Sequence, residues 1–156
     1  MAENNRSGPG DRRTNWRGGR RAHDHRQRPI VLVVDDHADS RELIAAVLGA
    51  ADIATAEASS GRTALQRILE VPRPSAVIID LGLPDCHGTD LIKTLRQAPE
   101  NAHLPILVLS ASVRDADRSG AAAAGAGAFL RKPILPVDLL SALREALAGT
   151  APPDLL

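Results

Sequence analysis

The sequence predicts an α/β protein built around a parallel sheet. Three short runs, at residues 30–34, 76–79 and 106–109, consist of Val, Ile, Leu and a single Ala, without polar residues between them. Continuous apolar strands are typical of a sheet that is covered on both faces, and such sheets are parallel. Amphipathic helical patterns separate the runs. We therefore predict five βα units, doubly wound around one five-stranded parallel sheet.

Five strand patterns follow one another along the chain, and the second is weaker than its neighbours. In order, the predicted strands are Ile30–Val34, Ile53–Ala56, Ala76–Ile79, Ile106–Leu109 and Ala128–Leu130.

Five helical patterns connect or follow these strands. We expect Asp39 or Ser40 to cap the first helix and Ser60 to cap the second, in which Leu69 should face inward. The fourth pattern is rich in Ala and thinly apolar, and the fifth opens with a first-turn proline. The predicted helices are Ser40–Leu48, Ser60–Leu69, Thr89–Arg96, Arg114–Ala124 and Pro136–Leu147.

Composition limits the classes of function. Trp16 and Phe129 are the only aromatic residues of the 156, so the core must be built from aliphatic side chains. The single cysteine, Cys86, excludes an intramolecular disulfide and a cysteine-cluster metal site. No apolar run reaches membrane-spanning length, and no secretory signal is recognisable. We expect a soluble, cytoplasmic protein without a membrane partner.

The chain divides into three parts. Residues 1–28 carry eight arginines against three acidic residues and few aliphatic side chains, so we expect a disordered Arg/Gly-rich arm. We expect residues 29–149 to form the domain and residues 150–156 to form a short tail, without an output domain. Around Trp16 the arm resembles Arg/Gly nucleic-acid-binding tails. Nucleic acid is therefore a possible partner through the arm only, and a plain solvated tail is the alternative.

Polar residues stand where the predicted strands end. Asp35 and Asp36 follow the first strand, Asp80 the third and Ser110 the fourth. A single such residue is usually a turn or a helix cap. Because ligands of open α/β sheets bind beyond the carboxyl ends of the strands, the set predicts a functional site there, joined by Lys132 after the fifth strand.

These side chains suit phosphoryl chemistry. Clustered carboxylates repel one another unless a cation joins them, and hard oxygen ligands favour Mg²⁺. An aspartate can act as a nucleophile toward phosphorus and form an aspartyl phosphate. An ammonium group and a hydroxyl can then stabilise the transferred phosphoryl group.

Ordered motifs over roughly residues 29–149 resemble the receiver domain of two-component response regulators. The motifs are Ile-Val-Leu-Val-Val-Asp35-Asp36, Val-Ile-Ile-Asp80-Leu-Gly-Leu-Pro84-Asp-Cys-His-Gly88, Leu-Val-Leu-Ser110-Ala111 and Gly125-Ala-Gly-Ala-Phe129-Leu-Arg-Lys132-Pro133. The resemblance implies a flavodoxin-like (βα)5 sandwich and a stand-alone, single-domain receiver. It further implies that the protein is not an enzyme, except that it catalyses its own Mg²⁺-dependent phosphorylation and dephosphorylation.

The resemblance also implies a role for each site residue. Asp80 is the expected phosphorylation site, with Lys132 pairing with the phosphoryl group and Ser110 turning to bond it. Phe129 is the expected aromatic switch that moves with Ser110, and the Lys132–Pro133 bond is expected to be cis. The implied Mg²⁺ ligands are Asp36 and Asp80 directly, Asp35 through water, and the Gly82 carbonyl.

The expected partners are a sensor histidine kinase or phosphotransfer protein as donor and an unknown downstream protein. Gly82 departs from the family, which usually has a longer side chain there, so we expect Gly82→Met or Gly82→Arg to change the lifetime of the aspartyl phosphate. Cys86, His87 and His37 are read as loop or helix-start residues.

The main alternative function is an aspartate-nucleophile phosphohydrolase. Such enzymes carry the nucleophile after the first strand and a second aspartate two residues later. The segment Asp35-Asp36-His37-Ala38 lacks that spacing.

Overall fold

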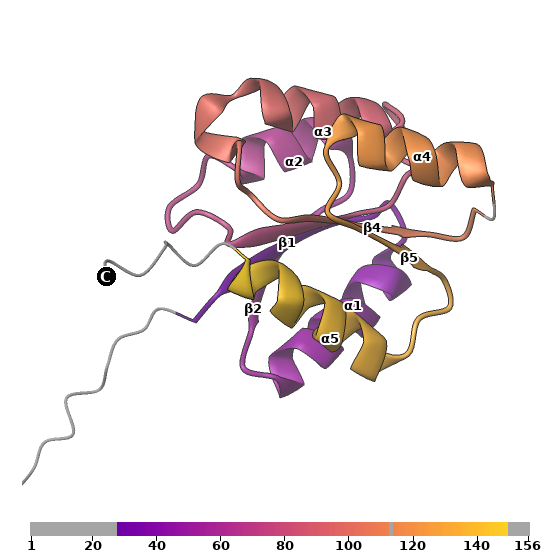
Figure 1. Ribbon diagram of the computed structural model, residues 1–156. Helices are drawn as coiled ribbons and strands as arrows, with labels where there is room; N and C mark the ends of the chain where they lie inside the picture. The colour runs from indigo at the N-terminus through magenta and orange to yellow at the C-terminus, as the bar shows by residue number, and fades with distance from the viewer. Residues whose placement is uncertain (1–27, 113, 150–156) are drawn as a thin grey trace, which may run out of the picture.

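The computed structural model describes residues 28–112 and 114–149, in which strands and helices alternate throughout (Figure 1). The predicted α/β class is confirmed. In chain order the elements are β1 Ile30–Val34, α1 Ala38–Ala50, β2 Ala54–Ala58, α2 Gly61–Arg67, β3 Ala76–Ile79, α3 Gly88–Gln97, the 3-10 helix η1 Pro99–Asn101, β4 Ile106–Ser110, α4 Asp115–Ala124, β5 Ala128–Arg131 and α5 Pro136–Ala148.

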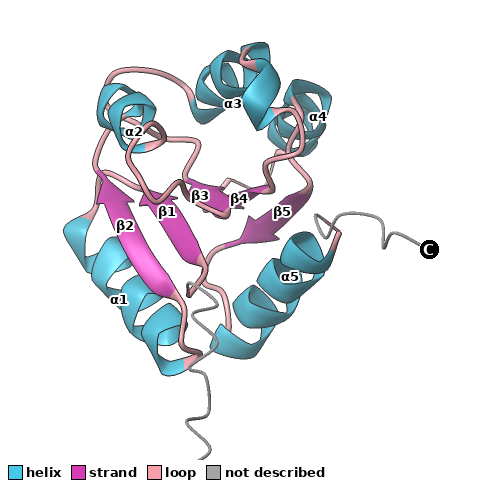
Figure 2. Cartoon of the chain, turned by 90° about the vertical axis from the view of Figure 1, so that its left-hand side faces the viewer, coloured by secondary structure: helices cyan, strands magenta, loops and turns pink. Residues whose placement is uncertain are grey.

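The five strands form one parallel sheet in the order β2-β1-β3-β4-β5. The chain starts near the middle of the sheet, runs to one edge through β2, and then returns to build the other edge. Because each crossover must pack its helix back onto the sheet, this reversal places helices on both faces. Helices α1 and α5 cover one face and α2, α3 and α4 cover the other (Figure 2). The strand order changes direction between β1 and β3, where open sheets of this kind bind ligands.

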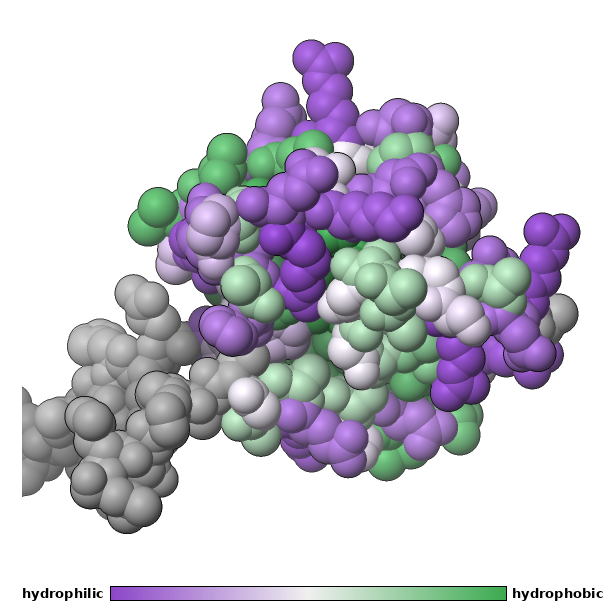
Figure 3. Space-filling view, turned by 45° about the horizontal axis from the view of Figure 1, so that its top comes forward, coloured by the Kyte–Doolittle hydropathy of each residue, from purple (hydrophilic) through white to green (hydrophobic). Residues whose placement is uncertain are grey.

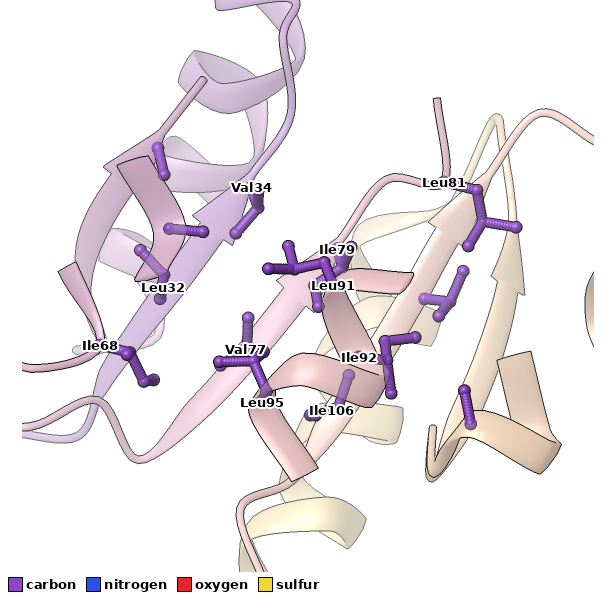
Figure 4. Close-up of a cluster of buried hydrophobic side chains, with 14 of the residues drawn as sticks. Leu32, Val34, Ile68, Val77, Ile79, Leu81, Leu91, Ile92, Leu95 and Ile106 are labelled. Carbon is purple, nitrogen blue, oxygen red and sulfur yellow. The ribbon is translucent and has the colours of Figure 1, made fainter. Parts of the chain in front are cut away.

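Two apolar layers hold the helices to the sheet. Alternate residues of each central strand point into opposite layers, so Leu32 joins the layer under α2, α3 and α4, while Val33 joins the layer over α1 and α5. Figure 4 shows the first layer, where Leu91, Ile92 and Leu95 of α3 lie against the sheet. Leu32 and Val33 are both fully buried, and burying a side chain of this size contributes about 1.5–3 kcal/mol.

Helix α4 packs on its layer through small side chains. Its buried residues are only Ala121 and Ala124, as the Ala-rich sequence led us to expect. The helix ends at Gly125, whose φ of 114° is a left-handed conformation that glycine adopts without steric cost. Seen from outside, this side of the molecule is mostly hydrophilic, with apolar side chains between the polar ones (Figure 3).

Several predicted helix ends differ from the structure by one or two residues, including the end of the first helix, predicted at Leu48 and observed at Ala50. Helix α2 ends at Arg67, and Leu69 is 67% exposed where we predicted an inward side chain. The reason is that the N–H groups of Leu69 and Glu70 bond carbonyls three residues back. These bonds tighten the last turn and rotate Leu69 outward.

The first helix also starts earlier than predicted. His37 occupies the N-cap position of α1 without a side-chain capping bond, so neither Asp39 nor Ser40 caps this helix. The helix begins early because the Asp35 carboxylate accepts the His37 N–H at 2.9 Å and turns the chain at once. Ser60 does cap α2 as predicted, accepting the Thr63 N–H at 3.1 Å.

No helix within residues 28–112 and 114–149 has the length and apolar character needed to cross a bilayer.

Candidate functional site

The carboxyl ends of three adjacent strands bring the predicted site residues together. In the ladder Val34 pairs with Ile79, and Ile79 pairs with Val108. The next residues, Asp35 and Asp80, therefore leave the sheet side by side, with the end of β4 next to them.

Each of these strand ends makes the same local turn. A side-chain oxygen accepts the backbone N–H two residues later, which is the ordinary turn-forming role of Asp and Ser. The turn role and the chemical role coexist, because the turn fixes the direction of each side chain. The bonds run from His37 N–H to Asp35 Oδ1 (2.9 Å), from Gly82 N–H to Asp80 Oδ1 (3.2 Å) and from Ser112 N–H to Ser110 Oγ (3.1 Å).

Lys132, which follows the edge strand β5, bridges the carboxylates of Asp35 and Asp80. Its Nζ lies 2.8 Å from Asp35 Oδ2 and 3.1 Å from Asp80 Oδ2. Its own N–H donates to the Ser110 carbonyl at 2.9 Å, which fixes where the side chain leaves the backbone. The Lys132–Pro133 peptide that follows is cis, as the family resemblance implied.

The charges of Asp35 and Lys132 shift each other's pKa. Burial raises the pKa of the Asp35 carboxyl, but the Lys132 ammonium and the His37 N–H outweigh burial and hold that pKa below its usual value. Burial lowers the pKa of Lys132, and the bonds to Asp35 and Asp80 overcome it, so the net pKa is raised. Both groups are therefore held in their charged forms.

The acidic cluster has more negative charge than Lys132 can balance. Ligand atoms of Asp35, Asp36, His37 and Asp80 all lie within 4.8 Å of one another. The Asp36 side chain is 33% exposed and lies 2.9 Å from the His37 ring. Three carboxylates, set against one ammonium, form a hard oxygen set open to solvent at Asp36, and this chemistry fits Mg²⁺.

The Ser110 hydroxyl and the Phe129 ring lie on the same side of the sheet. Phe129 pairs with Val108, two residues before Ser110, and residues two apart on a strand face the same way. Ser110 is 4% exposed, and Phe129 is half-buried against the layer under α3 and α4. The two predicted switch residues therefore lie on the same face of the adjacent strands β4 and β5, two positions apart in the register.

Gly82 leaves space beside Asp80. A Cβ built at this position would meet no atom within 4 Å, so the site is open on that side. The Gly82 N–H itself donates to the Asp80 carboxylate.

Two features of the loop after β3 escaped the sequence reasoning. Asp85 accepts the N–H groups of Gly61 (2.8 Å) and Arg62 (2.9 Å), so the loop is fastened to the start of α2. These bonds hold the pKa of Asp85 below its usual value, and the bond from the Arg62 N–H has the largest effect. The His87 ring caps α3 by accepting the Thr89 N–H at 3.2 Å. An Asp or His followed by a helical pattern was the only signal for either role.

Gly88, at the start of α3, is required by packing. A Cβ there would lie 2.7 Å from Leu81 Cα and 2.8 Å from the Asp80 carbonyl. The helix therefore approaches the backbone of the site more closely than any side chain would allow. Cys86 beside it is half-buried, and burial, followed by the charge of Asp85, raises the pKa of its thiol.

Comparison with known proteins agrees with this fold. The family model for the response regulator receiver domain matches residues 31–144. Among curated proteins, the KDP operon transcriptional regulatory protein KdpE of Escherichia coli is 37% identical over 133 residues, covering 81% of this chain and 56% of KdpE. The chain belongs to the response regulator receiver family, whose members act in two-component systems.

Solved structures of the same family superpose on the chain. A response regulator receiver protein from Pseudomonas putida has 32% identity and a TM-score of 0.71, covering 76% of this chain and 97% of that one. Chemotaxis response regulator CheY4 of Vibrio cholerae has 28% identity and a TM-score of 0.71, with 76% and 98% covered. The chain spans about half the length of KdpE and of other curated regulators that it matches.

Proposed function

We propose that this chain is a Mg²⁺-dependent phosphoacceptor that takes a phosphoryl group on Asp80 from a histidine kinase or a phosphotransfer protein. The observation that carries the proposal is the bridge from Lys132 Nζ to Asp35 (2.8 Å) and Asp80 (3.1 Å). It places a fixed positive charge against an aspartate whose side chain is still 13% exposed. The acceptor domain is assigned to residues 29–149.

In the proposed reaction an Asp80 carboxylate oxygen attacks the phosphorus of a phospho-histidine. The new O–P bond forms as the P–N bond of the donor breaks, and the imidazole leaves with that electron pair. Lys132 stabilises the charge on the phosphoryl oxygens, and the Ser110 hydroxyl turns to donate to one of them. The Gly82 N–H holds the carboxylate in a fixed orientation during the attack.

Asp35, Asp36 and Asp80 would hold the Mg²⁺, together with the Gly82 carbonyl. When bound, the ion neutralises charge on the phosphoryl oxygens. Ser110 and Phe129 are assigned as the switch pair through which the phosphorylated state reaches a downstream protein.

The test is labelling from radioactive acetyl phosphate in the presence of Mg²⁺. Asp80→Asn should abolish the alkali-labile label, and chelation of Mg²⁺ should do the same to the wild-type chain. Asp90→Asn, on the exposed side of α3, is the matched control and should label normally. Undiminished labelling of Asp80→Asn would move the acceptor to another residue.

The N-terminal arm, a candidate for nucleic-acid binding, lies almost wholly outside the described residues. Of its residues the structure describes Arg28, which pairs with Asp52 at 3.1 Å. Deleting the arm and measuring salt-dependent binding to RNA or DNA tests that role separately.

A further inference from the structure

Ser112, two residues beyond β4, hydrogen-bonds in two directions. Its backbone N–H donates to Ser110 Oγ at 3.1 Å. Its hydroxyl donates to the carboxylate of Asp117 and accepts the N–H of Arg114 at 3.2 Å. A continuous chain of hydrogen bonds therefore runs from the buried Ser110 hydroxyl to the first turn of α4.

None of the residues in the N-terminal half of α4 is buried. Arg114 is the N-cap residue and provides no side-chain capping bond. The buried residues of the helix, Ala121 and Ala124, lie in its second half.

The other end of α4 is anchored. The Arg96 guanidinium of α3 donates to the Gly125 carbonyl from Nη2 (2.8 Å) and Nε (3.3 Å). The helix thus has a fixed C-terminal end, while its N-terminal end is attached through Ser112 and Asp117.

We propose that Ser112 and Asp117 form a latch that holds Ser110 and α4 in the unphosphorylated arrangement. This inference rests on the proposed function, in which Ser110 turns toward a phosphoryl group on Asp80. That turn moves Ser110 Oγ away from the Ser112 N–H and breaks the chain of bonds at its first link. Ser112 then leaves the position in which its hydroxyl reaches Asp117, and the first turn of α4, released from Ser112, shifts about the end held by Arg96.

The latch has a thermodynamic consequence. A contact made only in the unphosphorylated state opposes phosphorylation, and by linkage its removal must favour binding of a phosphoryl group or its mimic. The gain equals what the contact contributed. For one partly exposed hydrogen bond this is on the order of a fivefold change in affinity.

The test uses the full chain and beryllofluoride, a phosphoryl mimic, at constant Mg²⁺. Ser112→Ala keeps the backbone N–H but removes the hydroxyl, and should bind beryllofluoride about fivefold more tightly than the wild type. Without beryllofluoride, amides in the first turn of α4 should exchange faster in this variant. Ser119→Ala, an exposed serine on the same helix, should change neither quantity, and Ser112→Thr, which retains a hydroxyl, should restore both.

A second pair of variants keeps the test decisive if Ser112→Ala folds poorly. Asp117→Ala removes the acceptor of the latch, whereas Asp115→Ala removes the same charge from the same turn. Equal beryllofluoride affinities in both pairs, with normal binding by the wild type, overturn the latch and leave the proposed function standing. Failure of the wild type to bind beryllofluoride overturns the proposed function itself, and the latch with it.

Discussion

Replacing Lys132 by methionine should reveal how much the fold depends on the charge at its site. Methionine keeps most of the aliphatic stem and removes the ammonium group. Asp35, whose side chain is only 3% exposed, then loses its 2.8 Å partner, and Asp80 loses its 3.1 Å partner. The carboxylates of Asp35 and Asp80 then lie beside Asp36 without the ammonium group that balanced their charge.

The magnitude follows from the burial of the three groups. Breaking a fully buried ion pair costs about 3–5 kcal/mol, and an exposed pair contributes about 0–1 kcal/mol. Lys132 lies between these limits, since its side chain is 22% exposed while both partners are more buried. We expect Lys132→Met to lower the free energy of unfolding by about 2–3 kcal/mol in the absence of divalent ions.

Urea denaturation in a chelating buffer measures this loss. Lys93→Met, on the exposed face of α3, is the matched control and should change the free energy of unfolding by less than about 0.5 kcal/mol. Mg²⁺ should stabilise Lys132→Met more than it stabilises the wild type, because the ion binds to an acidic cluster that has lost its competing cation. Equal losses in the two lysine variants would refute the reasoning, as would a Mg²⁺ effect that is the same in both.

Three further outcomes follow from the site. Gly82→Met should lengthen the half-life of phosphorylated Asp80, since the added side chain covers an open side of the site. An unchanged half-life, or an equal effect from the control variant Gly120→Met, would contradict this prediction. Gly88→Ala should destabilise the fold by about 1–3 kcal/mol through backbone overlap, whereas Gly120→Ala, with no atom within 4 Å, should be neutral or stabilising in urea unfolding. Asp85→Asn should be less stable than wild type at neutral pH. Because the folded pKa of Asp85 is lowered, that difference should disappear as the pH falls below 3.8, and a pH-independent difference in urea midpoints would contradict this.

The sequence predicted the centre of the fold better than its helix ends. Strands such as Ile30–Val34 and Ala76–Ile79 occur where predicted, because burial on both faces demands an unbroken apolar run. Leu69 was misplaced because local hydrogen bonds, which leave no periodic signal, decide how a helix ends. The N-cap positions of His37 and His87 depend in the same way on where the preceding loop ends.

The residue types of the candidate site, and their positions at strand ends, were evident in the sequence alone. Parallel strands must present their carboxyl ends at one edge, so Asp35, Asp80 and Ser110 were bound to gather there. Tertiary structure alone determined which groups touch: that Lys132 bridges Asp35 and Asp80, and that Ser112 connects Ser110 to α4. The contacts of Lys132 join loops that are distant along the chain, and those of Ser112 depend on the direction in which a single turn points its side chain. No residue pattern specifies such geometry.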